Sequence, residues 1–465
     1  MTRRVLRSFF ARIPPLALVV TVGLLSAEAG YSQSGSTGHK MEPGMDMEMG
    51  GKDKADKMDK GLLAQISPSR EGSGTSWMPD ESPMYGIHAK YNEWDLMFHG
   101  NLFVQSINEG SKRGDEQFGS INWIMAMAKT ETAGGNLNLR LMMSAENWTV
   151  GKCGYPDLLQ TGESCNGKAL HDDQHPHDLF MELAASFQRA INQDVGFEIY
   201  GGPAGEPALG PVAFPHRLSA FPGPQGPISH HWLDATHISF GVATVGVFTK
   251  NWKSELSLFN GREPDDNRTD FDLKPMDSYS GRISYLPNKN WALQISGGHL
   301  TEAEEDKAGK AFDVVRYTGS GMYHMKLEGD GIWATTLVYG VNKEGDESSP
   351  AALFESSLTI QNRYILSTRV ENVEKTGRDL VLEVPALDTK RYSLSKYSLG
   401  YMYQFLSGNQ WTPGIGFSVS STAIPSDLVG IYGEKNPVGF VVFASLRPAP
   451  MKMEGMGAMH GMGDM

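Results

Sequence analysis

The sequence has no apolar run long enough to cross a bilayer as a helix. The longest candidate, residues 16–25, has ten residues, whereas a membrane-spanning helix needs about 20. The run follows an arginine-rich N-terminus and precedes an A-x-A site that ends at Ala29. This pattern is typical of a secretory signal peptide, so we expect residues 1–29 to be removed after Ala29 on export.

Cysteine is also scarce, because the chain contains only Cys153 and Cys165. In an exported protein, two cysteines at this spacing are by default a disulfide that closes a short loop. A thiolate pair that binds a metal ion is the alternative. We therefore predict a disulfide between Cys153 and Cys165.

Positive charge is in deficit, with 41 Lys and Arg against 54 Asp and Glu and a formal net charge of −13. The signal peptide carries four arginines and one glutamate, so its removal lowers the net charge to about −16. Such an acidic chain argues against nucleic acid as a partner and suits a protein that handles cations or faces lipopolysaccharide.

Familiar catalytic motifs are missing as well. The sequence has no P-loop, no G-x-S-x-G, no H-E-x-x-H and no C-x-x-C-H haem motif. Each of these motifs places reactive groups at a spacing that its chemistry requires. We therefore expect that the protein is not an enzyme.

The dominant signal that is present is an alternation of apolar and polar residues with a period of two. In residues 397–405, for example, Tyr397, Leu399 and Tyr401 share one face of an extended chain. The same pattern recurs in residues 94–104, 136–146, 333–341, 358–370 and 438–446. About 14–16 such segments predict an all-β protein, a transmembrane antiparallel β-barrel over residues 76–447. A soluble β-sandwich is the alternative, although its strands are usually shorter.

Methionine is concentrated in two flanking segments, residues 30–75 and 448–465, which hold 11 of the 24 methionines. Both segments are rich in glycine and lack a hydrophobic period, so we expect disordered Met-rich tails. Thioether sulfur is a soft ligand that favours Cu(I); a solvated linker of accidental composition is the alternative. The candidate ligands are Met41, Met45, Met47, Met49, Met453, Met456, Met459 and Met462.

Histidine is concentrated in residues 171–237, which contain seven of the thirteen. Imidazole beside carboxylate is the ligand set of copper or zinc, and the candidate ligands are His171, His175, His177, His216, His230, His231, His237 and Asp234. Asp172, Asp173 and Asp234 are expected either as ligands or as groups that orient the ligands. We expect both histidine groups at strand mouths rather than in helices, and a Pro/Gly-rich run that folds inward to bring His216 near them. The alternative is a rim of polar loop residues.

Two long segments, residues 147–177 and 202–235, separate predicted strands and are expected to be extracellular loops or inward plugs. The acidic run at residues 263–272 is interpreted as a solvated extracellular turn. An even number of strands predicts that both termini are periplasmic. The expected partners are outer-membrane lipid and lipopolysaccharide, with periplasmic metal-handling proteins as further candidates.

The order of signal peptide, Met/His/Gly/Asp-rich segment and barrel resembles the copper-resistance protein B family of outer-membrane proteins. Only Met41, Met45, Met47 and Met49 match that family in residue type. Residues 171–183 and 258–265 are similar to motifs of uncharacterised bacterial outer-membrane proteins. The resemblance implies copper handling in the cell outer membrane.

The leading hypothesis is a barrel that binds copper, or zinc, and contributes to metal tolerance or to metal passage across the outer membrane. The tails would capture Cu(I), and the His/Asp cluster would suit Cu(II) or Zn(II). A general diffusion porin with no specific role for metal is one alternative. A metal-dependent outer-membrane enzyme is the other.

Overall fold

The computed structural model describes residues 61–151, 153–305, 311–405 and 410–451. Residues 60–465 group into one compact unit, and the description below concerns that unit. The expected signal peptide, all eight candidate methionine ligands and most of the two tails lie outside the described residues.

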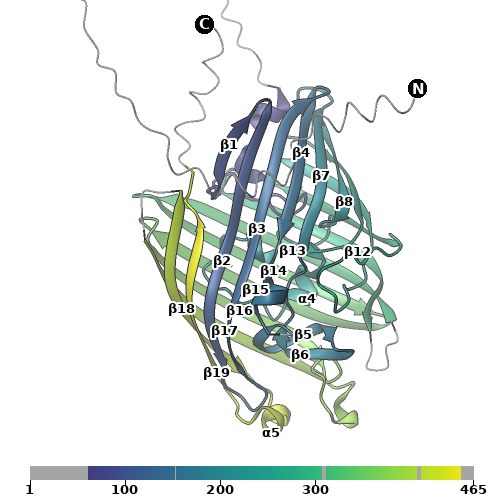
Figure 1. The fold of residues 1–465 in the computed structure, drawn as a ribbon. Coiled ribbons are helices and arrows are strands. Elements are labelled where there is room, and N and C mark those ends of the chain that lie inside the picture. The colour runs from purple at the N-terminus through teal and green to yellow at the C-terminus, as the bar shows by residue number, and fades with distance from the viewer. Residues whose placement is uncertain (1–60, 152, 306–310, 406–409, 452–465) are drawn as a thin grey trace, which may run out of the picture. The chain divides into compact units, whose positions relative to one another are not determined.

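Sixteen strands close into an antiparallel barrel (Figure 1), and the short strand β1 (Ile87–Tyr91) extends the sheet to 17 by pairing with β2. Consecutive strands pair in chain order, and the ring closes between β19 and β2 through pairs such as Phe440↔Asn108. The prediction of 14–16 strands is confirmed. The barrel strands are β2 (Trp94–Glu109), β3 (Glu116–Thr132), β4 (Gly135–Met143), β7 (Phe180–Ala190), β8 (Gly196–Ala204), β9 (Val242–Phe248), β10 (Trp252–Phe259), β11 (Ser278–Tyr285), β12 (Trp291–Glu305), β13 (Ala311–Leu327), β14 (Gly331–Glu344), β15 (Glu347–Ile360), β16 (Tyr364–Thr376), β17 (Arg391–Gln404), β18 (Trp411–Ala423) and β19 (Val438–Pro448).

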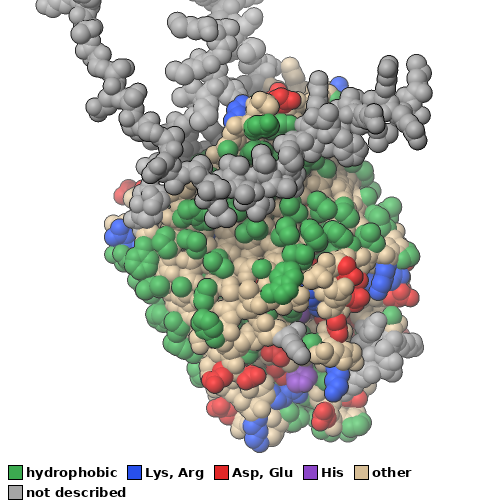
Figure 2. Space-filling view, in the orientation of Figure 1, with side chains coloured by type: hydrophobic (Ala, Val, Ile, Leu, Met, Phe, Trp, Pro, Cys, Tyr) green, Lys and Arg blue, Asp and Glu red, His purple; other side chains and the backbone are tan. Residues whose placement is uncertain are grey.

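The two faces of the sheet have opposite polarity. Leu256 and Leu399 point outward and are 66% and 68% exposed, whereas Lys396 and Glu355 point inward and are buried. Figure 2 shows hydrophobic side chains over much of the visible outer face. An apolar exterior around a polar interior is the pattern of a membrane-spanning β-barrel. None of the helices in the described ranges is long and apolar enough to span a membrane.

The two ends of the barrel differ in the length of their connections. At one end, which we call the short-turn end, six described connections have two to five residues. The tightest has Ala133 and Gly134 both at positive φ (51° and 70°), as a two-residue hairpin turn of type I′ requires. β2 begins and β19 ends there. The opposite loop end carries the long connections and the short helices η5 (Pro385–Leu387), η6 (Ser426–Leu428) and α5 (Val429–Tyr432) (Figure 1).

Residues 61–82 occupy the short-turn end of the barrel interior. They form η1 (Leu62–Gln65) and η2 (Pro68–Arg70), and Leu62 and Trp77 are buried against wall residues such as Phe248. The expectation of disorder is therefore wrong for residues 61–75. The average composition of this segment hides a few apolar side chains, which find packing partners only on the inner wall of the barrel. Tertiary packing therefore orders residues 61–75.

Residues 205–241, between β8 and β9, fold into the lumen, and we call them the inner segment. They contain η3 (Phe214–His216), α4 (His230–Leu233) and η4 (Ala235–His237). Arg217 Nε donates to Glu355 Oε2 of β15 at 2.9 Å, and Ser229 Oγ donates to Glu371 Oε1 of β16 at 2.8 Å. Arg316 of β13 donates to the carbonyl of His231 at 2.6 Å. Residues 202–235 were expected to form either an extracellular loop or an inward plug, and the structure shows the inward plug.

The inner segment also reaches the opposite side of the wall. Ala208 donates to Ser257 of β10, Gly210 donates to Ser296 of β12, and the His216 ring packs on Trp123 of β3. The cavity between residues 61–82, the inner segment and the wall holds about 10 Å³, which is roughly room for one water molecule. The inner segment therefore crosses the lumen at this level and packs closely against the wall and residues 61–82.

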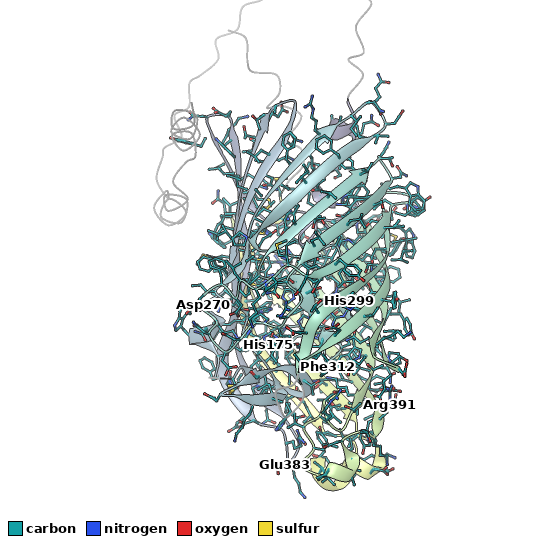
Figure 3. All side chains as sticks on the ribbon, turned by 90° about the vertical axis from the view of Figure 1, so that its right-hand side faces the viewer. His175, Asp270, His299, Phe312, Glu383 and Arg391 are labelled. Carbon is teal, nitrogen blue, oxygen red and sulfur yellow. A yellow bond between two sulfur atoms is a disulfide. The ribbon has the colours of Figure 1, made fainter. Side chains whose placement is uncertain are left out.

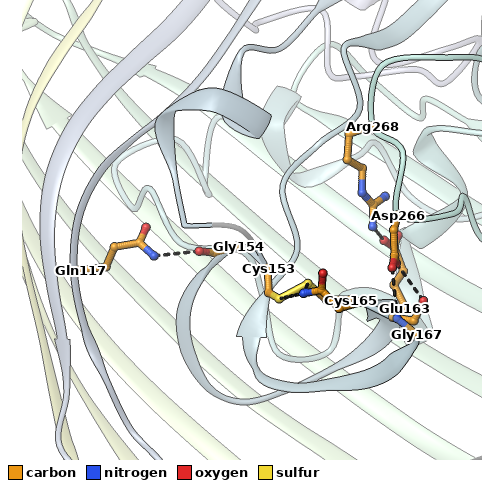
Figure 4. The surroundings of a disulfide bond; sticks show 10 residues. Gln117, Cys153, Gly154, Glu163, Cys165, Gly167, Asp266 and Arg268 are labelled. Atoms are coloured by element: carbon orange, nitrogen blue, oxygen red, sulfur yellow. Dashed lines mark hydrogen bonds and ion pairs between the residues drawn. A yellow bond between two sulfur atoms is a disulfide. The ribbon is translucent and has the colours of Figure 1, made fainter.

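Residues 144–179 form a separate cap at the loop end. They contain α3 (Glu146–Thr149) and a hairpin of β5 (Tyr155–Cys165) and β6 (Lys168–Gln174). The predicted disulfide between Cys153 and Cys165 is confirmed (Figure 4). The cap is tied to the wall, since Gln117 of β3 donates to the carbonyl of Gly154 at 2.8 Å. It thereby holds the first histidine group over the inner segment.

Candidate metal centre

Five imidazoles from the two histidine groups meet inside the barrel, and we call them the imidazole centre: His175, His177, His230, His231 and His237. His175 is labelled within the barrel in Figure 3. The ring centroids are 5.7 Å apart for His175 and His231, 5.2 Å for His230 and His231, 5.1 Å for His230 and His237, and 5.4 Å for His177 and His237. Two rings that bind one ion through nitrogen at 2.0–2.1 Å have centroids about 5 Å apart at a tetrahedral angle. These spacings therefore suit shared coordination.

The Nδ1 atom of every ring in the centre already faces an acceptor. The acceptors are Pro176 O for His175 (3.1 Å), Glu146 Oε2 for His177 (2.9 Å), Asp234 Oδ1 for His230 (2.8 Å), Glu263 Oε1 for His231 (3.1 Å) and Asp234 O for His237 (3.0 Å). Neutral imidazole carries one proton, and an acceptor beside Nδ1 alone favours the proton there, as at His177, His230, His231 and His237. The lone pair is then on Nε2, as in histidines whose orientation a carboxylate or carbonyl fixes for metal binding.

The Nε2 atoms of His177, His231 and His237 are buried and have no hydrogen-bond partner among the described residues. Leaving such an atom unsatisfied costs about 1–3 kcal/mol each. His175 differs, because its Nε2 lies 3.1 Å from Glu163 Oε1, so this ring has an acceptor beside each nitrogen. Ligand atoms of His175, His230 and His231 lie within 4.8 Å of one another. A cation bound among these three rings would satisfy Nε2 of His231.

Burial keeps most of the rings neutral. Desolvation lowers the pKa of His231 to about 4 and lowers the pKa values of His175, His230 and His237 below their usual range. His177 differs: burial opposes its protonation, but the adjacent Glu146 carboxylate outweighs burial and raises its pKa. Neutral imidazole is the form that binds a metal ion.

A second group with more oxygen adjoins the first. Ligand atoms of His231, Glu263 and Glu304 lie within 4.8 Å of one another. Glu163 and Asp178, close by, both pair with Arg268 (Figure 4 shows the Glu163 pair). The centre therefore offers imidazoles toward the inner segment and carboxylates toward the residue 260–277 loop.

No family model matches the chain, and no curated protein matches it. Among solved structures, the chain is similar to the outer-membrane protein OmpT of Vibrio cholerae with loop L8 deleted (TM-score 0.44, 11% identity, covering 77% of this chain and 100% of that chain). It is also similar to Salmonella typhi OmpF in complex with daunomycin (TM-score 0.46, 8% identity, 77% and 100%). A third is the anion-selective porin from Comamonas acidovorans (TM-score 0.45, 9% identity, 77% and 99%).

Two predicted ligands lie apart from the imidazole centre. His171 is on β6, its side chain is 41% exposed, and its Nδ1 lies 2.9 Å from Asp172 Oδ2. His216 does fold into the lumen, but its ring packs on Trp123 and His99 with centroids 5.0 and 6.0 Å away. Sequence spacing placed both histidines beside real members of the centre but could not show which way each ring points.

Other site predictions are refined or wrong. Asp234 orients the His230 ring and does not itself reach the centre, since it accepts a hydrogen bond from His230 and pairs with Arg217 at 2.6 Å. The second histidine group lies in the helical turns α4 and η4, against the expectation of no helix, because residues 230–237 pack inside the lumen instead of joining the sheet. Asp172 is used structurally, pairing with Arg113 at 2.6 Å.

The acidic run is only partly a solvated turn. Asp265, Asp266 and Asp270 are exposed as expected, but Glu263 turns inward to His231. Sequence reasoning also missed Glu146, Glu163 and Glu304 entirely. Only Glu263 gave a usable signal, its place at the start of the acidic run. The other three lie far along the chain from the histidines they approach.

Glu146→Gln should weaken Zn²⁺ binding about 10- to 100-fold. Glu146 is fully buried, and its Oε2 accepts from both the backbone N and the Nδ1 of His177, at 3.0 and 2.9 Å. Glutamine can still accept from Nδ1, but it lacks the negative charge that makes the His177 ring more basic, so Nε2 becomes a weaker ligand. The measurement is competition with a chromophoric chelator. Glu347→Gln, an exposed carboxylate paired with Arg391, is the matched control, and equal Zn²⁺ affinity in the two variants would contradict the role of Glu146.

Proposed function

We propose that the protein is an outer-membrane barrel that binds copper or zinc in its lumen and contributes to metal tolerance or to metal passage across the membrane. The observation that carries this proposal is the convergence of buried imidazoles, of which His177, His231 and His237 have an engaged Nδ1 and an unpaired Nε2. Imidazole suits Zn²⁺ and Cu²⁺, and adjacent carboxylates are compatible with both ions.

The orientation in the membrane follows from the connections. In outer-membrane barrels, short turns face the periplasm and long loops face outward. On that basis the cap and the imidazole centre are nearer the outside, and both ends of the barrel chain leave on the periplasmic side. The methionines of the two flanking segments would then meet Cu(I) in the periplasm, which is the part of the proposal that rests on sequence alone.

The segment that crosses the lumen favours a specific role over general diffusion. A diffusion porin has a water-filled channel, whereas here the inner segment contacts wall strands on opposite sides. Passage of an ion would require ligand exchange along the lumen or displacement of the inner segment. A metal-dependent enzyme shares the same centre, and turnover with substrates of hydrolases distinguishes it.

The experiment is elemental analysis of the full mature chain purified from outer membranes and dialysed against Zn²⁺ before desalting. Thioethers hold Zn²⁺ poorly, so the retained zinc reports the imidazole centre and not the methionines. We expect at least one Zn²⁺ per chain and no solute conductance through the wild-type protein in planar bilayers. Zinc-free protein after this treatment would refute the proposal, and large steady conductance would favour the porin.

A further inference from the structure

A second group of possible ligands lies on the inner wall and has different chemistry. His99 of β2, Met125 of β3 and Met142 of β4 are directly opposite one another in the sheet register. Residues directly opposite in an antiparallel pair have Cβ atoms about 4.5–5.5 Å apart. Met125 and Met142 are buried, at 3% and 4% exposed. The row therefore places two thioethers beside an imidazole inside the barrel.

The surroundings close this row from the lumen side. Met125, Met142, Met181 and Trp123 belong to one buried cluster, which also includes residues of the inner segment. The rings of His99 and His216 each pack on Trp123, with centroids 5.3 and 5.0 Å away. His216 thus brings a second imidazole from the inner segment to the same place.

Methionine often only fills irregular gaps in a core. A packing role does not explain His99, however, because its Nε2 is buried and has no hydrogen-bond partner among the described residues. Placing an unsatisfied imidazole nitrogen in a thioether-lined cluster is unfavourable unless something binds there. Met402 on β17 provides the contrast, since it is fully buried in a cluster of Phe, Ile and Val side chains.

We propose that His99, His216, Met125 and Met142 form a binding site for a soft monovalent cation, Cu(I) or Ag(I). Thioether sulfur with imidazole nitrogen is a ligand set that selects Cu(I) over harder ions. The inference rests on the proposed metal-binding role of the lumen and adds a site that takes the monovalent ion directly.

The two sites are neighbours along the lumen. Phe214 of η3 packs on His177, His230 and His237 of the imidazole centre, with centroids 5.8, 5.2 and 5.9 Å away. Two residues later, His216 packs on Trp123. Glu146, which accepts a hydrogen bond from His177, also accepts one from the backbone of Asn122 on β3. Met125 lies three residues further along β3, toward the short-turn end. Three strand residues span roughly 10 Å, so the proposed Cu(I) or Ag(I) site lies about that much nearer the short-turn end than the imidazole centre does.

The test is titration of the full mature chain with Ag(I), a redox-stable probe of soft sites, under competition with a thioether chelator. The methionines of the flanking segments also bind Ag(I), so the informative quantity is the difference between variants. We expect Met125→Leu with Met142→Leu to bind one Ag(I) fewer than the wild type, and Met402→Leu to match the wild type. Exchanging methionine for leucine is nearly volume-conserving. His216→Phe provides an independent variant outside the barrel wall with the same expected loss.

Zinc content measured on the same samples separates the two proposals. Retained Zn²⁺ with an unchanged Ag(I) count in the Met125/Met142 and His216 variants would overturn the soft site and leave the imidazole centre standing. The loss of one Ag(I) in those variants supports the proposed Cu(I) or Ag(I) site. This conclusion holds even if the wild type fails to retain Zn²⁺ and the imidazole centre is refuted. An equal loss in Met402→Leu would show that core disturbance alone removes Ag(I), and would also overturn the inference.

Discussion

Replacing His230 by glutamine is expected to raise the Kd for Zn²⁺ by about 100-fold or more, since even residues that only orient metal ligands are worth 10–100-fold. His230 is the middle member of the imidazole centre, with its ring next to those of His175, His231 and His237. Glutamine can still donate to Asp234, so the hydrogen bond that anchors α4 is preserved while the imidazole nitrogen is lost. Isothermal titration with Zn²⁺ measures the change.

The control for this variant is His171→Gln. His171 comes from the same stretch of sequence, but it lies outside the imidazole centre and is half-exposed. We expect wild-type affinity for Zn²⁺ in His171→Gln. If both variants bound Zn²⁺ as the wild type does, the imidazole centre would not be the binding site.

Replacing Arg217 by alanine is expected to open the lumen to ions. Arg217 is completely buried, and it pairs with Asp234 at 2.6 Å and with Glu355 at 2.9 Å while donating to the carbonyl of Val212 at 2.9 Å. Without the guanidinium, buried Asp234 loses its counter-charge and Glu355 keeps only Arg369, and breaking such a buried pair costs about 3–5 kcal/mol. The least costly response is for the inner segment to move and let water reach them. Single-channel recording should show steady conductance that is absent from the wild type.

Arg391→Ala is the matched control for charge removal. Arg391 pairs with Glu347 and Glu374 at the loop end, where its side chain is partly exposed, and such surface pairs are worth about 1 kcal/mol or less. This variant should remain closed. Hydrogen exchange within residues 205–241 should rise in Arg217→Ala and stay unchanged in Arg391→Ala; a closed channel with unchanged exchange in Arg217→Ala would show that the ion pair does not hold the segment.

Sequence and structure agree best where a regular repeat decides the outcome. A period of two along a strand leaves only two faces, so the apolar outside and polar inside of the barrel were predictable. The Cys153–Cys165 disulfide was predictable because an exported chain with two nearby cysteines has one default pairing. Residues 61–75 were wrongly predicted to be disordered, because the apolar stretch around Leu62 is too short to show a hydrophobic period.

The imidazole centre was predictable as a region but not as an arrangement. Clustering in the sequence grouped seven histidines; the structure brings His175, His177, His230, His231 and His237 together and places His171 and His216 elsewhere. Asp234, four residues from His230, was indicated by the sequence, but Glu146 was not, because it meets His177 across 31 residues. Contacts of that kind depend on how the cap and the inner segment cross each other inside the barrel.

By itself, the sequence determined a barrel with an apolar outside, a polar lumen, a disulfide and a local excess of imidazole, because each of these follows from spacing between near neighbours. Only the tertiary structure decided that residues 205–241 cross the lumen, that five of the imidazoles converge with Nδ1 engaged, and that Met125 and Met142 lie in register beside His99. The physical reason is that a side chain's partners are set by strand register and by the path of long connections, and neither is encoded in the residues immediately around it.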